Sequence, residues 1–210
     1  MSRLLVGLII LCLSHFSLAG EPLEEIAAVV GVTPILHSDL ELARIVHLLE
    51  PSEDEGVETY HSRLLDARIR LELQYRNLEE SGTLYRLDLD VDGTTRSLAA
   101  RAGGEEALRD RLGQAGLTTD DVEELALRVA AVQAYVEERL RARITVTLED
   151  VEAAYRQLKT EIEAAGETAP PLAVVRDQLH RLVVERKLNW EIERWIEQAR
   201  ERQPVTRFHR

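Results

Sequence analysis

The stretch "TTDDVEELALRVAAVQAYVEERLRARITV", from Thr118 to Val146, decides the fold class. Its apolar side chains recur every three or four residues, at Val122, Leu125, Val129, Val132, Val136 and Leu140. Because an α-helix has about 3.6 residues per turn, this spacing lays one apolar stripe along a helix. The T-x-x-D spacing of Thr118 and Asp121 is typical of a helix start. The segment therefore predicts a long amphipathic helix.

Further helical segments lie on both sides of this one, and most begin with a capping pattern. Ser38 and Glu41 have the S-x-x-E spacing, Thr147 and Asp150 have the T-x-x-D spacing, and Pro171 can stand at a first helical position. The wide leucine stripe of the second helix predicts a central place in the core. We expect these helices over residues 38–50, 59–81 (followed by Gly82), 105–116, 147–165 and 171–202.

Short strands are expected near both ends of the chain. "IAAVVGVTPIL" (26–36) is rich in β-branched residues and predicts two strands around a turn at Gly31 to Pro34. "VTRFHR" (205–210) follows Pro204 and predicts a short edge strand. In residues 84–104, "LDLDVDG" alternates like a strand and "RSLAARAGG" indicates a short helix stopped by two glycines. The sum is a mainly α protein with two or three short strands.

The first 19 residues have the layout of a secretory signal peptide. Arg3 precedes an apolar run over residues 4–13, and Ser17-Leu18-Ala19 forms a small-x-small site, so we expect cleavage between Ala19 and Gly20. A membrane span is the alternative, but it needs roughly 20 apolar residues. Cys12, the single cysteine, would leave with the peptide. Export without disulfides suits a bacterial periplasm, which is the localisation we predict.

The charge of the chain argues against several classes of partner. The formal net charge is −12, from 38 acidic and 26 basic residues. Nucleic-acid binding needs clustered Lys and Arg, and anionic membrane surfaces also attract basic segments. We therefore expect no nucleic-acid partner.

The patterns that carry chemistry in other proteins are incomplete in this chain. "DLDVDG" places Asp88, Asp90, Asp92 and Gly93 at the first, third, fifth and sixth positions of a calcium loop, but Ala99 stands where the bidentate Glu belongs. His37, His47, His61, His180 and His209 show no zinc-site spacing. No G-x-S-x-G or phosphate-loop motif is present. We expect no catalytic residue, cofactor, metal or small-molecule substrate, and an exposed strand or turn at the aspartates.

The order of the segments resembles the SurA-type periplasmic chaperones. "IAAVVGVTPILHSDLELA" is similar to their opening strand, turn, strand and helix, and "RLLDARIRLELQYRNLEESG" is similar to their second helix. "LRDRLGQAGLTTDDVEELALRVAAVQAYVEERLRARITVTLEDVEAAY" resembles their next unit, and "PLAVVRDQLHRLVVERKLNWEIERWIEQARERQPV" resembles their C-terminal helix. The resemblance implies a helical chaperone domain in which the C-terminal helix folds back and its strand joins the N-terminal strands.

The chain departs from that family at one junction. The family carries one or two parvulin-type prolyl isomerase domains before the C-terminal helix, whereas here "AAGETAPP" (164–171) bridges the gap. The resemblance therefore implies a signal peptide over 1–19, a helical domain over 20–165, a connection over 166–171 and a returning helix and strand over 172–210. It implies no isomerase activity.

The function expected from this resemblance is a holdase for unfolded or newly exported polypeptides, outer-membrane proteins among them. Candidates for a client groove are Tyr60, Tyr75, Tyr85 and Tyr135, whose alternative role is core packing. One alternative function is a dedicated interaction subunit or a homodimer of the same fold. A third alternative is a prolyl isomerase, and its only support is that the family as a whole carries isomerase domains.

Overall fold

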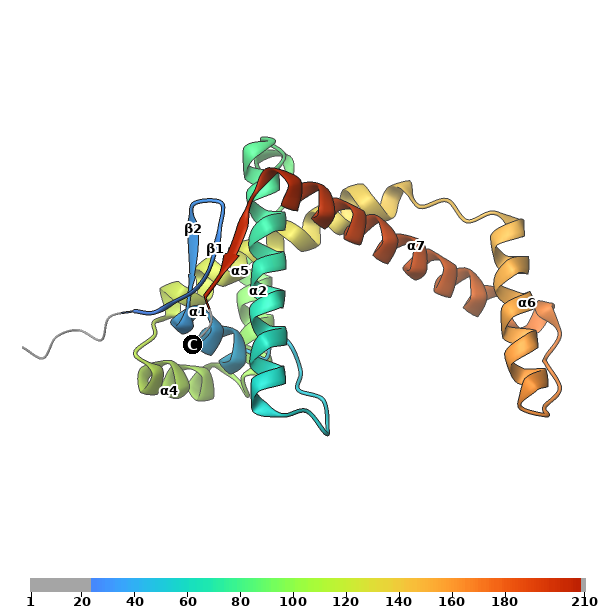
Figure 1. Cartoon of the computed structure of the whole chain (residues 1–210), viewed down its shortest axis with the longest axis horizontal. Coiled ribbons are helices and arrows are strands. Elements are labelled where there is room, and N and C mark those ends of the chain that lie inside the picture. The colour runs from blue at the N-terminus through green and yellow to red at the C-terminus, as the bar shows by residue number, and fades with distance from the viewer. Residues whose placement is uncertain (1–23, 209–210) are drawn as a thin grey trace, which may run out of the picture.

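The computed structural model describes residues 24–208, so the predicted signal peptide, its cleavage site at Ala19 and Gly20, and His209 lie outside the described residues. The described chain is mainly helical, with seven α-helices and a small antiparallel sheet (Figure 1). The α-helices are α1 (His37–Ile45), α2 (Val57–Glu80), α3 (Val91–Arg101), α4 (Glu105–Ala115), α5 (Thr119–Tyr135), α6 (Leu148–Ala164) and α7 (Leu172–Arg202). The strands are β1 (Ile26–Val30), β2 (Thr33–Leu36) and β3 (Val205–Arg207).

The sheet joins the two ends of the described chain. Its strand order is β2-β1-β3, and β1 pairs antiparallel with both neighbours. Gly31 begins the two-residue loop between β1 and β2 with φ +61°, a conformation that glycine adopts without strain. The predicted turn at Gly31 to Pro34 is too long, because Pro34 lies inside β2. Proline is tolerated there since β2 is an edge strand.

Helix α2 is the centre of the packed body, as its wide leucine stripe predicts. Its buried side chains enter three different apolar clusters: Leu71 packs with α1, α3, α4 and α5, Leu73 packs with the sheet and Ile196 of α7, and Leu78 packs with Trp195 of α7. Gly82, with φ +65°, ends the helix in a Schellman arrangement, in which the Thr83 N–H donates to the Leu78 carbonyl at 2.9 Å.

Helix α1 begins earlier than the Ser38–Glu41 capping pattern predicts. Leu36 is the N-cap residue, and its N–H donates to Asp39 Oδ2 at 2.8 Å. The Ser38 hydroxyl donates instead to the Glu24 carboxylate, and Glu41 pairs with Arg44. The prediction was wrong because β2 continues directly into the helix, which shifts the capping carboxylate to Asp39. The helix also stops at Ile45, short of the predicted 50.

Residues 84–104 contain no strand, contrary to the reading of "LDLDVDG". A 3₁₀ turn, η1 (Leu84–Arg86), leads to α3, and the Asp90 carboxylate caps α3 by accepting the Gly93 N–H at 2.8 Å. Leu87 and Leu89 are partly buried against the cluster that holds Trp195. The alternation therefore reflects apolar side chains that pack into the body, and no strand pairing.

Helix α5 confirms the long amphipathic segment and its start. The Thr118 N–H donates to Asp121 Oδ2 at 2.7 Å, as a capping box requires. The helix continues into a π-helical turn, η2 (Val136–Leu140), and a 3₁₀ turn, η3 (Arg141–Arg143). Leu140 in the π-helical turn is buried in the same cluster as Leu188 and Trp195. The change of pitch keeps the end of the segment in contact with α7.

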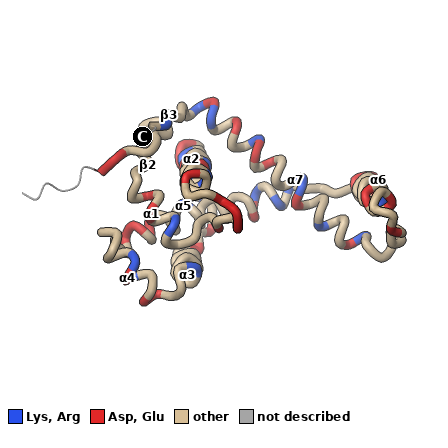
Figure 2. Tube along the Cα trace, turned by 60° about the horizontal axis from the view of Figure 1, so that its bottom comes forward, with Lys and Arg blue, Asp and Glu red and all other residues tan. Residues whose placement is uncertain are grey.

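Helices α6 and α7 form an arm that projects from the body (Figure 1). We use "arm" for α6 with residues 172–183 of α7, and "body" for the sheet, α1–α5 and residues 188–202 of α7. The arm has its own apolar cluster, made of Val151, Ala154, Leu179 and Val183. Figure 2 shows acidic and basic residues interspersed along α7. The Thr147 cap of α6 is confirmed, since the Asp150 N–H donates to the Thr147 hydroxyl at 3.2 Å. Pro171, expected at the first helical position of α7, is instead its N-cap, and the helix begins at Leu172.

Candidate functional site

An open apolar groove runs between α2 and α5, with α7 at its rim. It encloses about 550 Å³. We call it the α2–α5 groove. Arg70 of α2 and Glu193 of α7 pair across the rim, with Nη1 and Oε2 separated by 3.0 Å. The groove is lined by the apolar residues Leu48, Leu49, Ala67, Leu71, Val129 and Val132 and by the polar residues Arg63, Asp66, Arg70, Gln74, Gln133 and Glu193.

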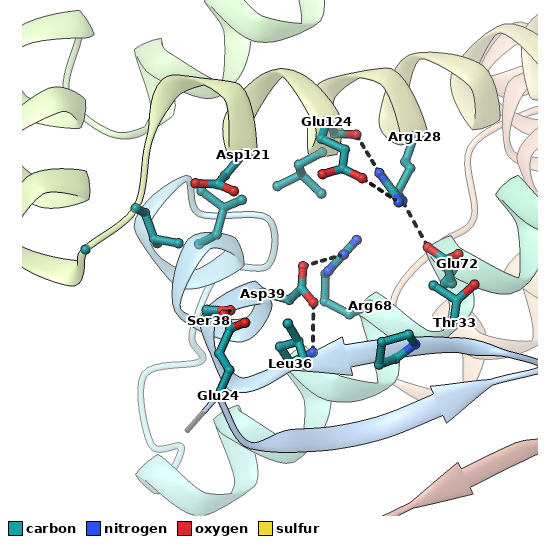
Figure 3. A pocket seen from close by; sticks show the side chains of 15 residues that line it. Glu24, Thr33, Leu36, Ser38, Asp39, Arg68, Glu72, Asp121, Glu124 and Arg128 are labelled. Carbon is teal, nitrogen blue, oxygen red and sulfur yellow. Dashed lines mark hydrogen bonds and ion pairs between the residues drawn. The ribbon is translucent and has the colours of Figure 1, made fainter. Parts of the chain in front are cut away.

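A second hollow, the Arg68 cavity, lies between β2, α2 and the first half of α5 (Figure 3). It encloses about 380 Å³ and its lining is mainly polar. Arg68 and Glu72 come from α2, Asp39 comes from α1, and Arg128 comes from α5. Arg68 is 4% exposed and Glu72 is 3% exposed, so two of the charged side chains that line the cavity are buried.

The charges in the Arg68 cavity form three ion pairs, two of which share Arg128. Arg68 Nη2 lies 3.3 Å from Asp39 Oδ1. Arg128 Nε lies 3.0 Å from Glu72 Oε2, and its Nη2 lies 3.1 Å from Glu124 Oε1. Burial lowers the pKa of Arg68 below its usual value, although Asp39 and Glu72 oppose the shift. Burial also opposes the charge of Arg128, but Glu72 and Glu124 outweigh it and raise the pKa.

Part of the Arg68 guanidinium has no protein partner. Within the described residues, no acceptor lies within hydrogen-bond reach of Arg68 Nε or Nη1, and both atoms are buried. In Figure 3 the guanidinium lies in the middle of the cavity, between Asp39 and Arg128. Buried donors without an acceptor cost free energy, and protein interiors satisfy nearly all of them. The fold thus leaves hydrogen-bond donors of Arg68 unsatisfied, beside a cavity large enough to hold an oxygen atom from outside the fold.

The four tyrosines proposed for a client groove do not line one surface. Tyr75 packs under Arg128, whose Cζ lies 5.2 Å from the ring centroid, and Tyr135 packs on Trp195 with centroids 4.5 Å apart. Tyr60 lies at the other end of α2 and donates to the Leu49 carbonyl at 2.9 Å. Tyr85 is 81% exposed in η1. Tyr75 and Tyr135 share one apolar cluster, and none of the four lines the α2–α5 groove or the Arg68 cavity.

The structure places the other candidate residues apart from both hollows. His37 and His61 stack with ring centroids 5.8 Å apart, and His47 Nδ1 lies 3.5 Å from Glu50. Among residues 24–208, no group of three or more His, Cys, Asp or Glu side chains is arranged to hold a metal ion. None of the helices described here combines the length and the apolar composition that a membrane span needs.

The Arg68 cavity was missed at the sequence level, although α2 carries a signal for it. Arg68 stands four residues after Leu64 and three before Leu71, so it interrupts the leucine stripe on the buried face. A charged residue at such a position must find a partner or a ligand inside the fold. Its partner Asp39 and the second arginine of the cavity, Arg128, lie far away in the sequence, which is why no local motif contains them.

The fold and its two hollows define a helical protein with an open, partly apolar surface and a buried arginine cavity. No protein-family model matches the chain, and no curated protein matches it.

Proposed function

We propose that the protein is an exported, periplasmic chaperone-like holdase of the SurA N-terminal type. It binds unfolded or newly exported polypeptides, outer-membrane proteins among them, and has no isomerase activity. In this proposal residues 1–19 are a signal peptide, 20–165 form the helical domain, 166–171 replace the isomerase domain of the family, and 172–210 return to the same domain.

The observation that carries the proposal is the α2–α5 groove. It presents the half-buried Leu48, Leu49, Val129 and Val132 beside a rim of charged and amide side chains. Apolar grooves between helices bind peptide segments through a few apolar anchors. Because this groove is open, a bound segment keeps part of its surface in water, and we expect modest, reversible affinity for many sequences. Those are the properties of a holdase.

The arm supports the same proposal. Helix α7 contributes Glu193 to the rim of the groove and then continues outward to α6 (Figure 1). An unfolded chain that lies in the groove can therefore extend along α7 toward the arm. A holdase of this shape shields a client segment by partial enclosure and needs no chemical step.

The test is suppression of aggregation of an unfolded outer-membrane protein by the purified chain. Leu49→Gln places a polar amide in the groove and should weaken suppression several-fold. Val57→Gln is the matched control, because Val57 is 85% exposed and does not line the groove. A wild-type chain that leaves aggregation unchanged at several-fold excess would rule out the holdase.

The absence of isomerase activity is tested separately. A proline-containing peptide should isomerise at the same rate with and without the protein. Clear acceleration would contradict the proposal that residues 166–171 replace the isomerase domain. It would favour a prolyl isomerase.

A second candidate function is a dedicated interaction subunit or a homodimer, and exposed apolar residues on α7 favour it. Val174 is 75% exposed and Trp190 is 59% exposed, with Arg194 Cζ 4.7 Å from the Trp190 ring centroid. Mass by light scattering distinguishes the functions. A dimer, or one stoichiometric partner that masks Trp190, would favour this candidate over a promiscuous holdase.

A further inference from the structure

The Arg68 cavity has features that the α2–α5 groove does not share. Its central donors, Nε and Nη1 of Arg68, are buried and meet no acceptor in the described chain. The arginine enters from α2 and is buried, and only its Nη2 is paired, with Asp39. An oxygen atom is the complementary group, since a guanidinium carries donors and no acceptor.

The surrounding charges decide which kind of oxygen atom fits. Arg68 and Arg128 are balanced by Asp39 and Glu72 within the cavity. The remaining charged lining residues are all acidic: Glu24, Asp121 and Glu124. Glu124 shares Arg128 with Glu72, so five acidic side chains face two arginines in the lining, and an incoming anion would meet the excess negative charge. A neutral carbonyl oxygen avoids the repulsion and still accepts hydrogen bonds from Arg68, while a cationic group near it gains from the acidic rim.

The neighbouring strand limits how a peptide can enter. Strand β2 is an edge strand, and Pro34 lines the cavity. Proline has no backbone N–H, and the Leu36 N–H is already donated to Asp39. A peptide therefore gains little by pairing with β2 as an added strand. Side chains of the cavity, above all Arg68, must supply the hydrogen bonds.

We propose that the Arg68 cavity binds a short polypeptide segment, in which a neutral backbone carbonyl accepts from Arg68 and an adjacent Lys or Arg side chain lies against the carboxylates of Glu24, Asp121 and Glu124. The cavity volume of about 380 Å³ is within the range of roughly 300–1,000 Å³ typical of ligand pockets. This inference rests on the proposed function, since it supplies a holdase with a preference for basic client segments.

The experiment uses the purified full chain and three short capped peptides of equal length. They differ only in two side chains, which are both Lys, both Gln or both Glu. Fluorescence anisotropy should show the Lys peptide binding at least about tenfold more tightly than the Glu peptide, a difference of about 1.4 kcal/mol. The Arg68 Nε–H resonance should shift on addition of the Lys and Gln peptides.

Substitutions test the two parts of the site. Arg68→Lys keeps the charge but loses the planar set of donors, so affinity for the Lys and Gln peptides should fall about tenfold. Arg44→Lys is the matched control, because Arg44 is exposed on α1 and pairs with Glu41 outside the cavity. Glu124→Gln should weaken binding of the Lys peptide and leave the Gln peptide unchanged. This third variant does not disturb Arg68, so it tests the site even where Arg68→Lys fails to fold.

Two results would overturn the inference: equal or tighter binding of the Glu peptide, or no shift of the Arg68 resonance with any peptide. Aggregation suppression, measured on the same samples, separates this outcome from failure of the proposed function. A chain that suppresses aggregation while Arg68 stays unperturbed is a holdase without this site. A chain that binds the Lys peptide but suppresses nothing has the site without the holdase function.

Discussion

The body and the arm are built from the same kind of helix but have very different cores. In the body, three apolar clusters meet at α2 and include contributions from the sheet and from α7. In the arm, α6 and the first half of α7 share one small cluster of four buried residues. Stability is distributed unevenly in proteins, and regions with few buried apolar contacts open at lower free energy. The arm should therefore open while the body stays folded.

The largest expected effect follows truncation in the body. Leu73 is fully buried where α2 meets the sheet and Ile196 of α7. Leu73→Ala leaves a cavity and should lower the free energy of unfolding by about 2–5 kcal/mol. Denaturant unfolding followed by circular dichroism measures this loss, and the whole body should unfold in one transition. Leu182→Ala, on the half-exposed side of α7, is the control and should change stability little.

A smaller effect, confined to the arm, is expected for Leu179→Ala. Leu179 is one of the four buried residues of the arm cluster. Its truncation should lower the free energy of opening the α6–α7 contact by about 2 kcal/mol or more. The body should keep its stability, because Leu179 packs only within the arm cluster. Hydrogen exchange should accelerate at amides of α6 and residues 172–183, while amides of α2 keep their protection. Equal acceleration in both regions would show that arm and body unfold together, and would contradict the expectation that the arm opens while the body stays folded.

The smallest effect is the pH dependence of the arm. The Lys187 ammonium, 2.6 Å from Asp150 Oδ2, and the Thr147 backbone and hydroxyl lower the pKa of Asp150 from 3.8 to about 2. Because the folded pKa is depressed, this contribution is complete above about pH 4 and is lost as the pH falls through about 2. Protection factors of α6 amides, which correct for the intrinsic pH dependence of exchange, should fall across that window. In Asp150→Asn, α6 amides should already be less protected at pH 5 than in the wild type. Their protection should then show no further loss from this group between about pH 4 and 2.

The helix ends show how far local chemistry predicts this fold. Thr118 with Asp121, Thr147 with Asp150, and Gly82 after α2 all act as their local patterns indicate. Each is decided within a few residues of backbone, where a side chain or a positive φ satisfies the groups that a helix end leaves open. The same locality explains why these predictions did not depend on the rest of the chain.

The failures arise where an adjoining element or packing against the body outweighs the pattern read from the sequence. Ser38 is not the N-cap of α1, because β2 runs directly into the helix. Leu36 is the N-cap instead, and its N–H donates to the Asp39 carboxylate. The aspartates of "DLDVDG" alternate like a strand, yet Leu87 and Leu89 pack into the body and Asp90 caps α3. The tyrosines proposed for a client groove stay a prediction, and the partial burial of Tyr75 and Tyr135 against an apolar cluster agrees with their alternative role in core packing.

By itself, the sequence determined the helices of this protein, most of their ends and the two chain segments that form strands, because apolar periodicity and capping act over a few residues. The resemblance already implied that the C-terminal strand joins the N-terminal strands, and the sheet confirms this. Only the tertiary structure decided that β1 is the neighbour of β3, that α6 and α7 leave the body as an arm, and that Arg68 meets Asp39 across 29 residues. Those arrangements depend on which apolar faces are buried against one another. That choice is made by the whole chain, since each face gains free energy only when a complementary surface covers it.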